Sequence, residues 1–410
     1  MRYKYLEKNK LNQAVILCGG LGTRLGKITK KTPKPLIKIF KTKNILDLII
    51  YNLSRYGIKE VLLLCHYKYN LFKKKYHQKK INNCEIKCIY EKNLLGSAGS
   101  INNVRTKLDN EFLLCNGDTF FDINLLDLYT SYKKKYLGII SLAQTNKGSN
   151  RYSKIILKNE KIVSFNANNK TKLINSGICI LNKKIFNYFN NSKSLEKEVF
   201  VNLCKKRKLQ GKIYNKNHNL FIDIGVKKDL IRSHSFFKKV LKKKAIFLDR
   251  DGIINLDKGY TFRIKDFYWR RKIKELIKYF NDNNFFVFVV TNQSGIGRGY
   301  YSETDVDKLH DWINYKLQTY GAHIDEFQYA TYFENSKIKK HLKKKLLRKP
   351  NIGMFKNLKK KWNINLKKSL VVGDKSTDID FANNAKLNSV LINPRDDIFN
   401  KVKKQILNIK

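Results

Sequence analysis

Two carboxylates stand one residue apart in the second half of the chain, in a setting suited to phosphoryl transfer. Asp249 and Asp251 follow the apolar run 245–248, and Gly252 comes directly after them. Carboxylates this close repel one another unless a cation lies between them, so the spacing favours a Mg²⁺ site. A metal-bound aspartate can attack phosphorus, and a second carboxyl group beside it can transfer protons.

Three later groups of residues supply the other parts of such a site. The apolar run 285–290 ends at Thr291, where a hydroxyl and backbone N–H groups can hold phosphate oxygens. Arg348 and Lys349 form a cationic pair outside any apolar pattern, and another strand-like run leads into Asp374. A nucleophile, a hydroxyl, a lysine and a metal carboxylate rarely occur in this order by chance.

Residues 244–410 resemble the haloacid-dehalogenase-type phosphatases. Within that group they are most similar to the D-glycero-D-manno-heptose 1,7-bisphosphate 7-phosphatases. The resemblance rests on four strings, which are DRDGIINLDKGYTFRIKDF (249–267), VTNQSGIGRGYYSE (290–303), RKPNIGM (348–354) and VGDKSTDIDFANNA (372–385).

The resemblance implies a role for each of the polar residues. Asp249 would be the nucleophile that becomes an aspartyl-phosphate. Asp251 would protonate the leaving sugar oxygen and then activate water. The remaining implied roles are phosphoryl binding by Thr291 and Lys349, substrate contact by Arg348 and Asn255, and Mg²⁺ binding by Asp249, Asp251 and Asp374.

The chain departs from these phosphatases in one loop. Relatives often carry a Cys/His zinc loop before the Arg-Lys-Pro string, but all seven cysteines here precede residue 244. No zinc is therefore expected, and His341 is expected to be a solvated residue. The gaps between the motifs are too short for a large cap domain, so the site is expected to be open to a sugar phosphate.

The first half begins with a phosphate-binding pattern of its own. The strand-like run 13–18 leads into a glycine-rich turn at 19–25, whose backbone N–H groups can close on a polyphosphate. Lys34 stands between two prolines, which hold the backbone stiff and can aim one ammonium group. Asp118 and Asp223 each end a strand-like run, and together they are interpreted as a pair for Mg²⁺-nucleotide.

Residues 12 to about 235 resemble the sugar-1-phosphate nucleotidyltransferases, in particular the heptose- and mannose-1-phosphate guanylyltransferase branch. The matching strings are GGLGTRLGKITKKTPKPLIKI, LLGSAGSI, LCNGDTFFDI, INSGICIL, SLEKEVF and FIDIGVKKDL. The implied reaction is in-line attack of a sugar 1-phosphate on the α-phosphorus, which expels pyrophosphate without a covalent enzyme intermediate. The implied residues are Gly20, Gly22, Thr23, Arg24, Lys34 and Gly96 for the nucleotide, with Arg24 and Lys34 catalytic, Asp118 and Asp223 for Mg²⁺, and Asn175, Gly177 and Glu196 for the sugar.

The departures in this half lie on the sugar side. Ser153 stands where the family usually has glycine in an Arg-Tyr-Gly string. Asn166-Ala167-Asn168 stands where it usually has a Glu-Lys pair, so the lysine expected for the sugar's phosphate is missing. We predict that Lys154 or Lys170 replaces it.

The order of apolar runs and helix-length segments predicts an α/β protein of two domains. Short apolar runs alternate with segments such as 44–56 and 306–320, which indicates βα units and two mainly parallel sheets. We expect a Rossmann-like (GT-A-like) nucleotidyltransferase domain over 1–235, a helical linker over 236–243, and a haloacid-dehalogenase-like Rossmannoid domain without a large cap over 244–410.

Composition limits the classes of partner. The 410 residues carry a formal net charge of +52, but the lysines are spread along the chain with no base-reading helix, so we expect phosphorylated small molecules and no specific nucleic acid. No apolar run approaches the roughly twenty residues of a membrane span. The N-terminus lacks a signal-like apolar segment, and the dispersed cysteines suit a reducing cytoplasm.

Together the halves predict two consecutive reactions: Mg²⁺-dependent removal of the 7-phosphate from heptose 1,7-bisphosphate, then nucleotidyl transfer to heptose 1-phosphate, with GTP the favoured donor. Three alternatives stay open. The first is a nucleotidyltransferase for mannose or glucose 1-phosphate beside another phosphatase, and the second is histidinol-phosphate phosphatase activity. The third is a non-catalytic RNA-binding protein. Sequence alone leaves the nucleotide, the anomer and the oligomeric state undecided.

Overall fold

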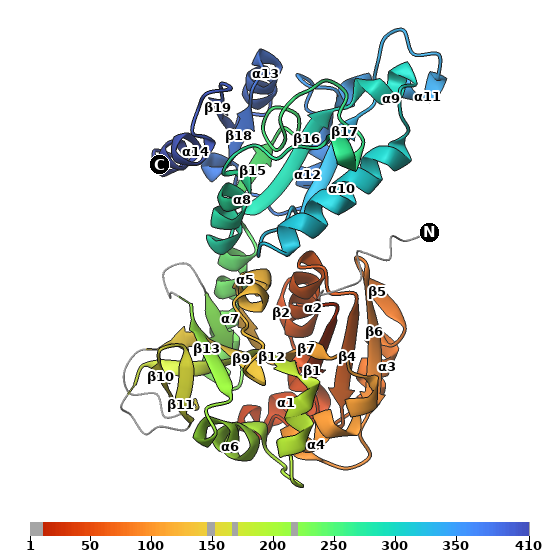
Figure 1. Cartoon of the computed structure of the whole chain (residues 1–410). Helices are drawn as coiled ribbons and strands as arrows, with labels where there is room; N and C mark the ends of the chain where they lie inside the picture. Colours follow the sequence, from red (N-terminus) through yellow and green to blue (C-terminus); the bar gives the residue numbers. More distant parts are fainter. Residues whose placement is uncertain (1–10, 146–151, 166–170, 215–219, 410) are drawn as a thin grey trace. The chain divides into compact units, whose positions relative to one another are not determined.

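A computed structural model describes residues 11–145, 152–165, 171–214 and 220–409. These residues form two compact units, of which the first ends at Val240 and the second begins at Leu241 (Figure 1). Helix α7 (Lys227–Val240) closes the first unit, so the segment 236–243 begins inside a helix. Both units combine helices with a central sheet, which is the α/β architecture that the sequence predicts.

The first unit is built on a ten-stranded sheet in the order β10-β11-β13-β9-β12-β7-β1-β4-β6-β5. All but the last residue of β1 is fully buried, because helices cover both faces of the sheet. The strands of this sheet are β1 (Gln13–Leu17), β4 (Glu60–Cys65), β5 (Lys79–Ile81), β6 (Cys84–Tyr90), β7 (Glu111–Asn116), β9 (Gly138–Gln144), β10 (Ile155–Lys158), β11 (Lys161–Phe165), β12 (Leu173–Asn182) and β13 (Leu209–Ile213).

The expectation of a mainly parallel sheet is wrong for this unit. Strands β1, β4, β6 and β7 run parallel, as do β9 and β13. Strand β12 is antiparallel to both β7 and β9, and β5, β10 and β11 also pair in the antiparallel sense. Apolar runs show that a strand is buried but carry no record of its direction, so the sequence could not reveal the mixture.

Two small ladders and seven α-helices are also present among the described residues of this unit. Strand β8 (Thr119–Phe121) pairs with β14 (Phe221–Asp223), and β2 (Lys38–Phe40) pairs with β3 (Lys43–Asn44). Asn44 and Asp47 form a reciprocal capping box at the start of α2. Besides α7 the helices are α1 (Lys27–Lys31), α2 (Ile45–Arg55), α3 (Tyr69–Tyr76), α4 (Gly96–Asn103), α5 (Leu125–Thr130) and α6 (Phe200–Lys205).

The second unit has a five-stranded sheet in the order β17-β16-β15-β18-β19, and every pair in it is parallel. Here the expectation of a parallel sheet is confirmed. The strands are β15 (Ala245–Leu248), β16 (Phe286–Asn292), β17 (Glu326–Ala330), β18 (Leu370–Gly373) and β19 (Asn388–Leu391).

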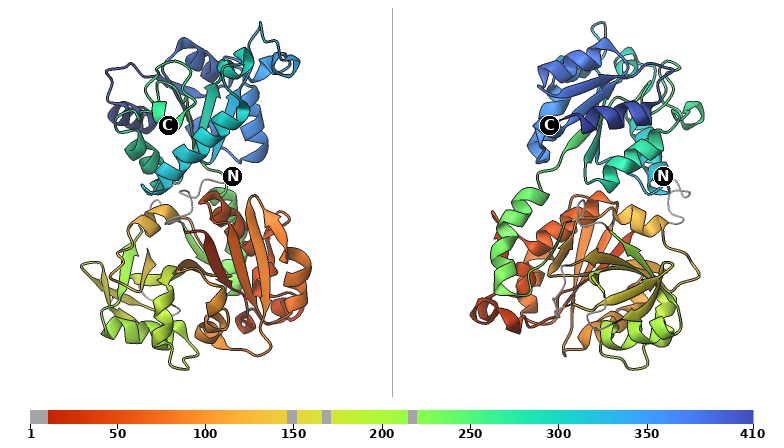
Figure 2. Two further views of the ribbon diagram at one scale, coloured as in Figure 1. Left: turned by 45° about the vertical axis from the view of Figure 1, so that its right-hand side comes forward. Right: turned by 90° about the vertical axis from the view of Figure 1, so that its left-hand side faces the viewer.

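Helices lie on both faces of this second sheet (Figure 2). Ile246 and Leu248 face the cluster built with α8, α10 and α14, whereas Phe247 between them packs on Phe288 and on Phe355 of α12. Alternate residues of one strand therefore enter two cores. The helices are α8 (Ile273–Asp282), α9 (Ser294–Arg298), α10 (Glu303–Gln318), α11 (Lys339–Leu342), α12 (Gly353–Lys361), α13 (Ser376–Asn384) and α14 (Ile398–Leu407).

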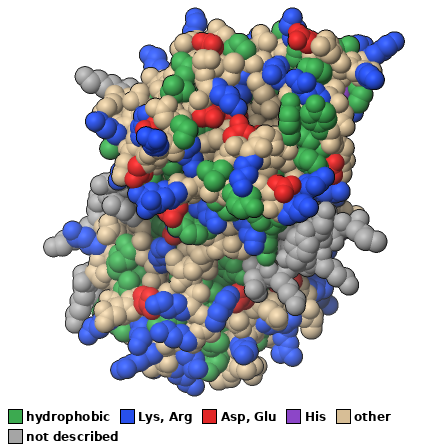
Figure 3. Space-filling view, turned by 45° about the horizontal axis from the view of Figure 1, so that its top comes forward, with side chains coloured by type: hydrophobic (Ala, Val, Ile, Leu, Met, Phe, Trp, Pro, Cys, Tyr) green, Lys and Arg blue, Asp and Glu red, His purple; other side chains and the backbone are tan. Residues whose placement is uncertain are grey.

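The basic side chains are dispersed over the face drawn in Figure 3, where Lys and Arg alternate with acidic, apolar and uncharged groups. All seven cysteines are buried and unpaired in the first unit. In the part of the chain that the structure describes, no helix is both long enough and apolar enough to cross a membrane.

Candidate active sites

Three aspartates gather at the carboxyl edge of the second sheet. Asp249 follows β15, Asp374 follows β18, and Asp378 lies in the first turn of α13. One carboxylate oxygen from each lies within 4.8 Å of the others. Oδ1 of Asp374 is buried and has no hydrogen-bond partner among the described residues. A set of hard oxygen donors with one orphaned oxygen fits a divalent cation such as Mg²⁺.

An ammonium group, that of Lys349, lies inside this acidic cluster. Its Nζ lies 2.7 Å from Oδ1 of Asp249 and 2.6 Å from Oδ1 of Asp378, and it donates to the carbonyl of Val290 at 2.9 Å. Burial, opposed by Lys349, raises the pKa of Asp249 to about 6. Burial also works against the charge on Lys349, but the two carboxylates raise its pKa above the ordinary value. The lysine is therefore charged. Its single positive charge does not balance the three aspartates, so a bound cation would complete the neutralisation.

Close backbone packing makes the acidic cluster possible. Gly252 has φ +90°, and a Cβ there would lie 2.2 Å from Oδ2 of Asp374. A Cβ on Gly373 would lie 2.1 Å from Cβ of Asp378. Both positions require glycine, because any side chain would displace a carboxylate of the cluster.

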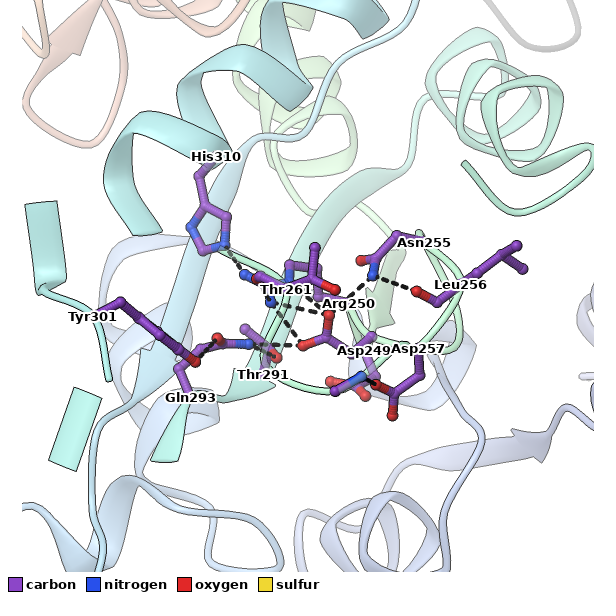
Figure 4. Close-up of polar contacts among 12 residues, drawn as sticks. Asp249, Arg250, Asn255, Leu256, Asp257, Thr261, Thr291, Gln293, Tyr301 and His310 are labelled. Carbon is purple, nitrogen blue, oxygen red and sulfur yellow. Dashed lines mark hydrogen bonds and ion pairs between the residues drawn. The ribbon is translucent and has the colours of Figure 1, made fainter. Parts of the chain in front are cut away.

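The carboxylate of Asp251 is not a member of this acidic group. It accepts hydrogen bonds from Arg250, from Asn255 at 3.0 Å and from Gln293 at 2.9 Å (Figure 4). Gln293 Nε2 also lies 3.0 Å from Oγ1 of Thr291, so it connects the predicted acid with the predicted phosphoryl-binding hydroxyl. The structure thus brings Thr291 and Asp251 together through a glutamine to which the sequence assigned no role.

Asn255 and Arg348, the two residues expected to face the substrate in this unit, both make contacts within the protein. The Asn255 side chain is buried and directed at Asp251 and at the carbonyl of Leu256. Arg348 is half-buried and donates from Nη1 to the carbonyl of Tyr332 at 3.3 Å. Asn255 is therefore a partner of the predicted acid, and Arg348 lies against the loop that precedes it.

The expectation that His341 is solvated is wrong. His341 is 1% exposed, and its Nδ1 lies 2.8 Å from Oγ1 of Thr331. Lys340 precedes His341 in the short helix α11. Its Nζ lies 3.1 Å from Oε1 of Glu303, which stands at the start of α10. The loop before Arg348 is therefore fixed by a buried histidine contact and a surface ion pair. Lysines flank His341 in the sequence, and this made the position look polar.

A cavity of about 380 Å³ lies beyond the end of β1 in the first unit. The predicted phosphate-binding residues line it together, namely Gly20, Gly22, Thr23, Arg24 and Lys34, with Gly96 and Asp118. The Lys34 ammonium donates to the Asp118 carboxylate. A Cβ on Gly22, which has φ +70°, would lie 2.8 Å from Thr29. Gly22 thus allows the loop to pack against Thr29, and Arg24, Lys34 and Asp118 place two cations and one carboxylate in the cavity wall.

The β8–β14 ladder brings the two predicted magnesium aspartates close in the fold, because Asp118 directly precedes β8 and Asp223 is the last residue of β14. Asp223 pairs with Thr119, and the N–H of Ile224 donates to the carbonyl of Asp118 at 3.0 Å. The Asp223 carboxylate accepts from the N–H of Gly225 at 2.7 Å, and Gly225 lines the cavity. Asp118 lines the cavity and Asp223 lies beside it in the fold, and two carboxylates are donors of the kind that Mg²⁺ accepts.

Glu91 lines the same cavity and had no role in the sequence analysis. It is 2% exposed, and its Oε1 has no hydrogen-bond partner among the described residues. Burial raises its pKa above the ordinary value. A buried acceptor without a partner is costly unless a ligand supplies the donor. The residue follows β6 and stands in no recognisable motif, so the signal for it was burial, which sequence does not show.

A second cavity of about 600 Å³ shares Leu17, Ser97 and Asn116 with the first. The predicted sugar residues Asn175, Gly177 and Glu196 line it. The Glu196 carboxylate accepts from Asn175 Nδ2 at 2.6 Å and from Ser153 Oγ at 2.9 Å. Ser153, noted as a departure from the family pattern, therefore helps to fix the acidic group of this cavity.

Lys154, one of the two predicted replacements for the missing lysine, does not line this cavity. Lys154 is buried, with its Nζ 3.5 Å from Oγ1 of Thr145, and it is absent from the cavity wall. Lys170 and the segment 166–168 lie outside the described residues. Lys197, one residue after Glu196, does line the cavity and is exposed.

The comparisons with known proteins agree with the division of the chain. The nucleotidyl transferase family matches residues 13–240, and the polynucleotide kinase 3 phosphatase family matches residues 244–398. A D-glycero-alpha-D-manno-heptose 1-phosphate guanylyltransferase of Campylobacter jejuni subsp. jejuni is 39% identical over 53% of this chain and 96% of that protein. A D-glycero-alpha-D-manno-heptose-1,7-bisphosphate 7-phosphatase of the same organism is 37% identical over 41% of this chain and 96% of that protein.

Among solved structures, HddC from Yersinia pseudotuberculosis in complex with GMP-PN is 26% identical and covers 55% of this chain and 99% of its own, with a TM-score of 0.47. The first unit thus has relatives among nucleotidyltransferases and the second among sugar phosphatases. The chain belongs to the nucleotidyl transferase family and carries, fused to that enzyme domain, a second enzyme domain of the heptose-bisphosphate phosphatase type.

Proposed function

We propose that the chain catalyses two consecutive steps in the synthesis of a nucleotide-activated heptose. The second unit removes the 7-phosphate from D-glycero-D-manno-heptose 1,7-bisphosphate. The first unit transfers GMP from GTP to the resulting heptose 1-phosphate and releases pyrophosphate. The observation that carries the proposal is a pair of relatives. Those of the second unit are named for a phosphatase of heptose 1,7-bisphosphate, and those of the first unit are named for a guanylyltransferase of heptose 1-phosphate, which is the product of that phosphatase.

In the phosphatase unit, Asp249 attacks phosphorus. Its Oδ1 is held by the ammonium of Lys349 at 2.7 Å, and the same ammonium is placed to neutralise charge on the transferred phosphoryl group. Asp251 gives a proton to the leaving sugar oxygen and later takes one from water. A Mg²⁺ held by Asp249, Asp374 and Asp378 would add charge neutralisation at the same oxygens.

In the nucleotidyltransferase unit, the loop of Gly20, Thr23 and Arg24 holds the triphosphate through backbone N–H groups and the guanidinium. Lys34 stabilises charge on the attacked α-phosphate. The sugar lies in the adjoining cavity, where Glu196 accepts from its hydroxyls. Asp118 and Asp223 would hold a Mg²⁺ that neutralises the phosphates. Because the two cavities share a wall, the sugar phosphate and the triphosphate lie side by side. Positioning and electrostatic stabilisation then supply the acceleration of nucleotidyl transfer.

The oxygen Oε1 of Glu91, which has no hydrogen-bond partner among the described residues, supports GTP as the donor. A carboxylate accepts two parallel hydrogen bonds from the N1–H and the 2-amino group of guanine. Adenine and the pyrimidine bases do not present that pair of donors. Binding of guanine would supply the partner that Oε1 of Glu91 lacks.

The test is a pair of variants assayed for both reactions in the full chain. Asp249→Asn removes the nucleophile, so phosphate release from heptose 1,7-bisphosphate should stop while pyrophosphate release from GTP and heptose 1-phosphate continues. Asp118→Ala should have the opposite effect. If either variant loses both activities while keeping its fold, the two sites are not independent. If the wild-type chain turns over histidinol phosphate but not the heptose bisphosphate, the assigned substrate is wrong.

A further inference from the structure

Arg250 is the largest of the fully buried side chains in the described structure, and its guanidinium is directed at Asp251. Nη2 donates to Oδ2 of Asp251 at 2.8 Å and to Oδ1 at 2.9 Å, and Nε donates to Oδ1 at 3.2 Å. Nη2 also donates to the carbonyl of Thr261 at 2.6 Å. A buried guanidinium is costly unless its N–H groups have hydrogen-bond partners, and these contacts supply them.

His310 satisfies the remaining side of the guanidinium. Its Nε2 lies 3.5 Å from Nη1 of Arg250 (Figure 4). Its ring stacks on Phe327 with centroids 4.3 Å apart. Burial and the neighbouring arginine hold the pKa of His310 well below its usual range, so the ring is neutral and its free lone pair can accept. Helix α10 thereby supports Arg250 from the side opposite Asp251.

Two amides fix the rest of the Asp251 carboxylate. Asn255 donates to Oδ1 at 3.0 Å, and Gln293 donates to Oδ2 at 2.9 Å. The hydroxyl of Tyr301 donates to Oε1 of Gln293 at 2.8 Å, which sets the orientation of that amide. The carboxylate is thus held from three directions, and only Arg250 contacts both of its oxygens through a single planar group.

We infer that Arg250 is a positioning residue for the phosphatase reaction: it holds the carboxyl group of Asp251 in the orientation needed for proton transfer to and from the scissile oxygen. This inference rests on the proposed phosphatase function. Arg250 does not touch the transferred phosphoryl group itself. General acid–base catalysis depends on a proton donor held within hydrogen-bond reach. Loss of the Arg250 guanidinium, which contacts both oxygens of Asp251, should therefore impair proton transfer more than nucleophilic attack.

Lysine cannot replace this arginine. The guanidinium makes contacts with Asp251, Thr261 and His310 in three different directions within one plane. The lysine ammonium is a single compact group, so it can reach only one or two of these three partners. Arg250→Lys keeps the charge but loses the geometry, and this separates positioning from simple charge compensation.

The experiment compares two phosphate esters that differ in their need for a proton. p-Nitrophenyl phosphate releases a stable anion, whereas heptose 1,7-bisphosphate releases an alkoxide that must be protonated. For Arg250→Lys, the first-turnover rate of leaving-group release should fall on the order of 100-fold for the sugar ester and less than about tenfold for the nitrophenyl ester. The first turnover is measured because both esters share the later attack of water on the aspartyl-phosphate, in which Asp251 also takes part. Asp251→Asn should show the same selectivity, and the double variant should be no slower than Asp251→Asn alone.

Equal loss of the first-turnover rate for both esters in Arg250→Lys, with an unchanged unfolding temperature, would overturn the inference in favour of a merely structural role. So would additive losses in the double variant. Should Arg250→Lys fail to fold, His310→Phe provides the same test, because it keeps the stacking on Phe327 and removes the acceptor; a sugar-ester-selective loss supports the inference and equal loss refutes it. A wild-type chain that hydrolyses neither ester, or an Asp249→Asn variant that still turns over, refutes the phosphatase proposal instead.

Discussion

Lys349 offers a direct test of how the acidic cluster is balanced. Its ammonium is completely buried and makes hydrogen bonds of 2.7 Å to Asp249, 2.6 Å to Asp378 and 2.9 Å to the carbonyl of Val290. Lys349→Met keeps the length of the side chain and removes the charge. Breaking a buried ion pair from one side costs about 3–5 kcal/mol, because the partner charges stay buried without compensation.

For a unit of this size, each kcal/mol lowers the unfolding temperature by about 2–4 °C, so the expected decrease is roughly 6–20 °C. Tryptophan fluorescence is the assay, because all three tryptophans, Trp269, Trp312 and Trp362, belong to the second unit. The protein is measured in EDTA, so that no divalent cation replaces the missing ammonium. The decrease should be smaller at pH 5 than at pH 8, because protonation of the raised carboxyl of Asp249 relieves part of the repulsion.

The matched control is Lys361→Met on the same unit. Lys361 also pairs with a carboxylate, that of Glu326 at 3.0 Å, but its side chain is 68% exposed. An exposed pair contributes at most about 1 kcal/mol, so the unfolding temperature should hardly change. If Lys349→Met in EDTA unfolds within a few degrees of this control, then the carboxylates around Lys349 are not strongly desolvated and our reading of the cluster is wrong.

Three further predictions concern single residues. Lys197→Ala should raise the KM for the sugar 1-phosphate, because Lys197 lines the sugar cavity, whereas Lys154→Ala should not; equal effects in steady-state pyrophosphate assays would count against the assignment. Glu91→Gln should reduce the preference for GTP over ATP by about 10–100-fold in kcat/KM, since one buried hydrogen-bond pair to the base is lost. His310 is neutral when folded, so the folded state binds fewer protons than the unfolded one below about pH 6.5 and stability falls as the pH decreases. Relative to His310→Phe, the wild type should lose about 1.4 kcal/mol per pH unit there in denaturant titrations, and identical slopes would exclude the effect.

Sequence reasoning located most of the phosphatase site because parallel strands end at one edge of a sheet. Asp249, Thr291 and Asp374 each end or follow an apolar run, and the structure places all three strands side by side in a parallel sheet. Lys349 was found from charge in an unusual place rather than from periodicity. Asp378 was not assigned a role, since it reaches the cluster from a helix and only because Gly373 leaves room for it.

The residues that sequence reasoning missed or misjudged are those whose role depends on burial. His341 stands among lysines, yet it is 1% exposed against Thr331. Glu91 lies in no motif, and only its enclosure beside the nucleotide cavity distinguishes it. The direction of β12 is a similar case, because an apolar run predicts that a strand is buried and not which way it runs. Solvent exposure and strand direction are both set by contacts between segments far apart in the chain.

The fit around Gly252 and Gly373 restricts how this enzyme can change over generations. A single methyl group at either position would meet the Asp374 or Asp378 side chain at 2.2 or 2.1 Å, well inside van der Waals contact. Variation that alters the substrate range of this unit is therefore expected outside these two positions, in segments such as the loop before Arg348. In a mutational scan of phosphatase activity, we expect these two glycines to tolerate no substitution, while nucleotidyl transfer by the same variants continues.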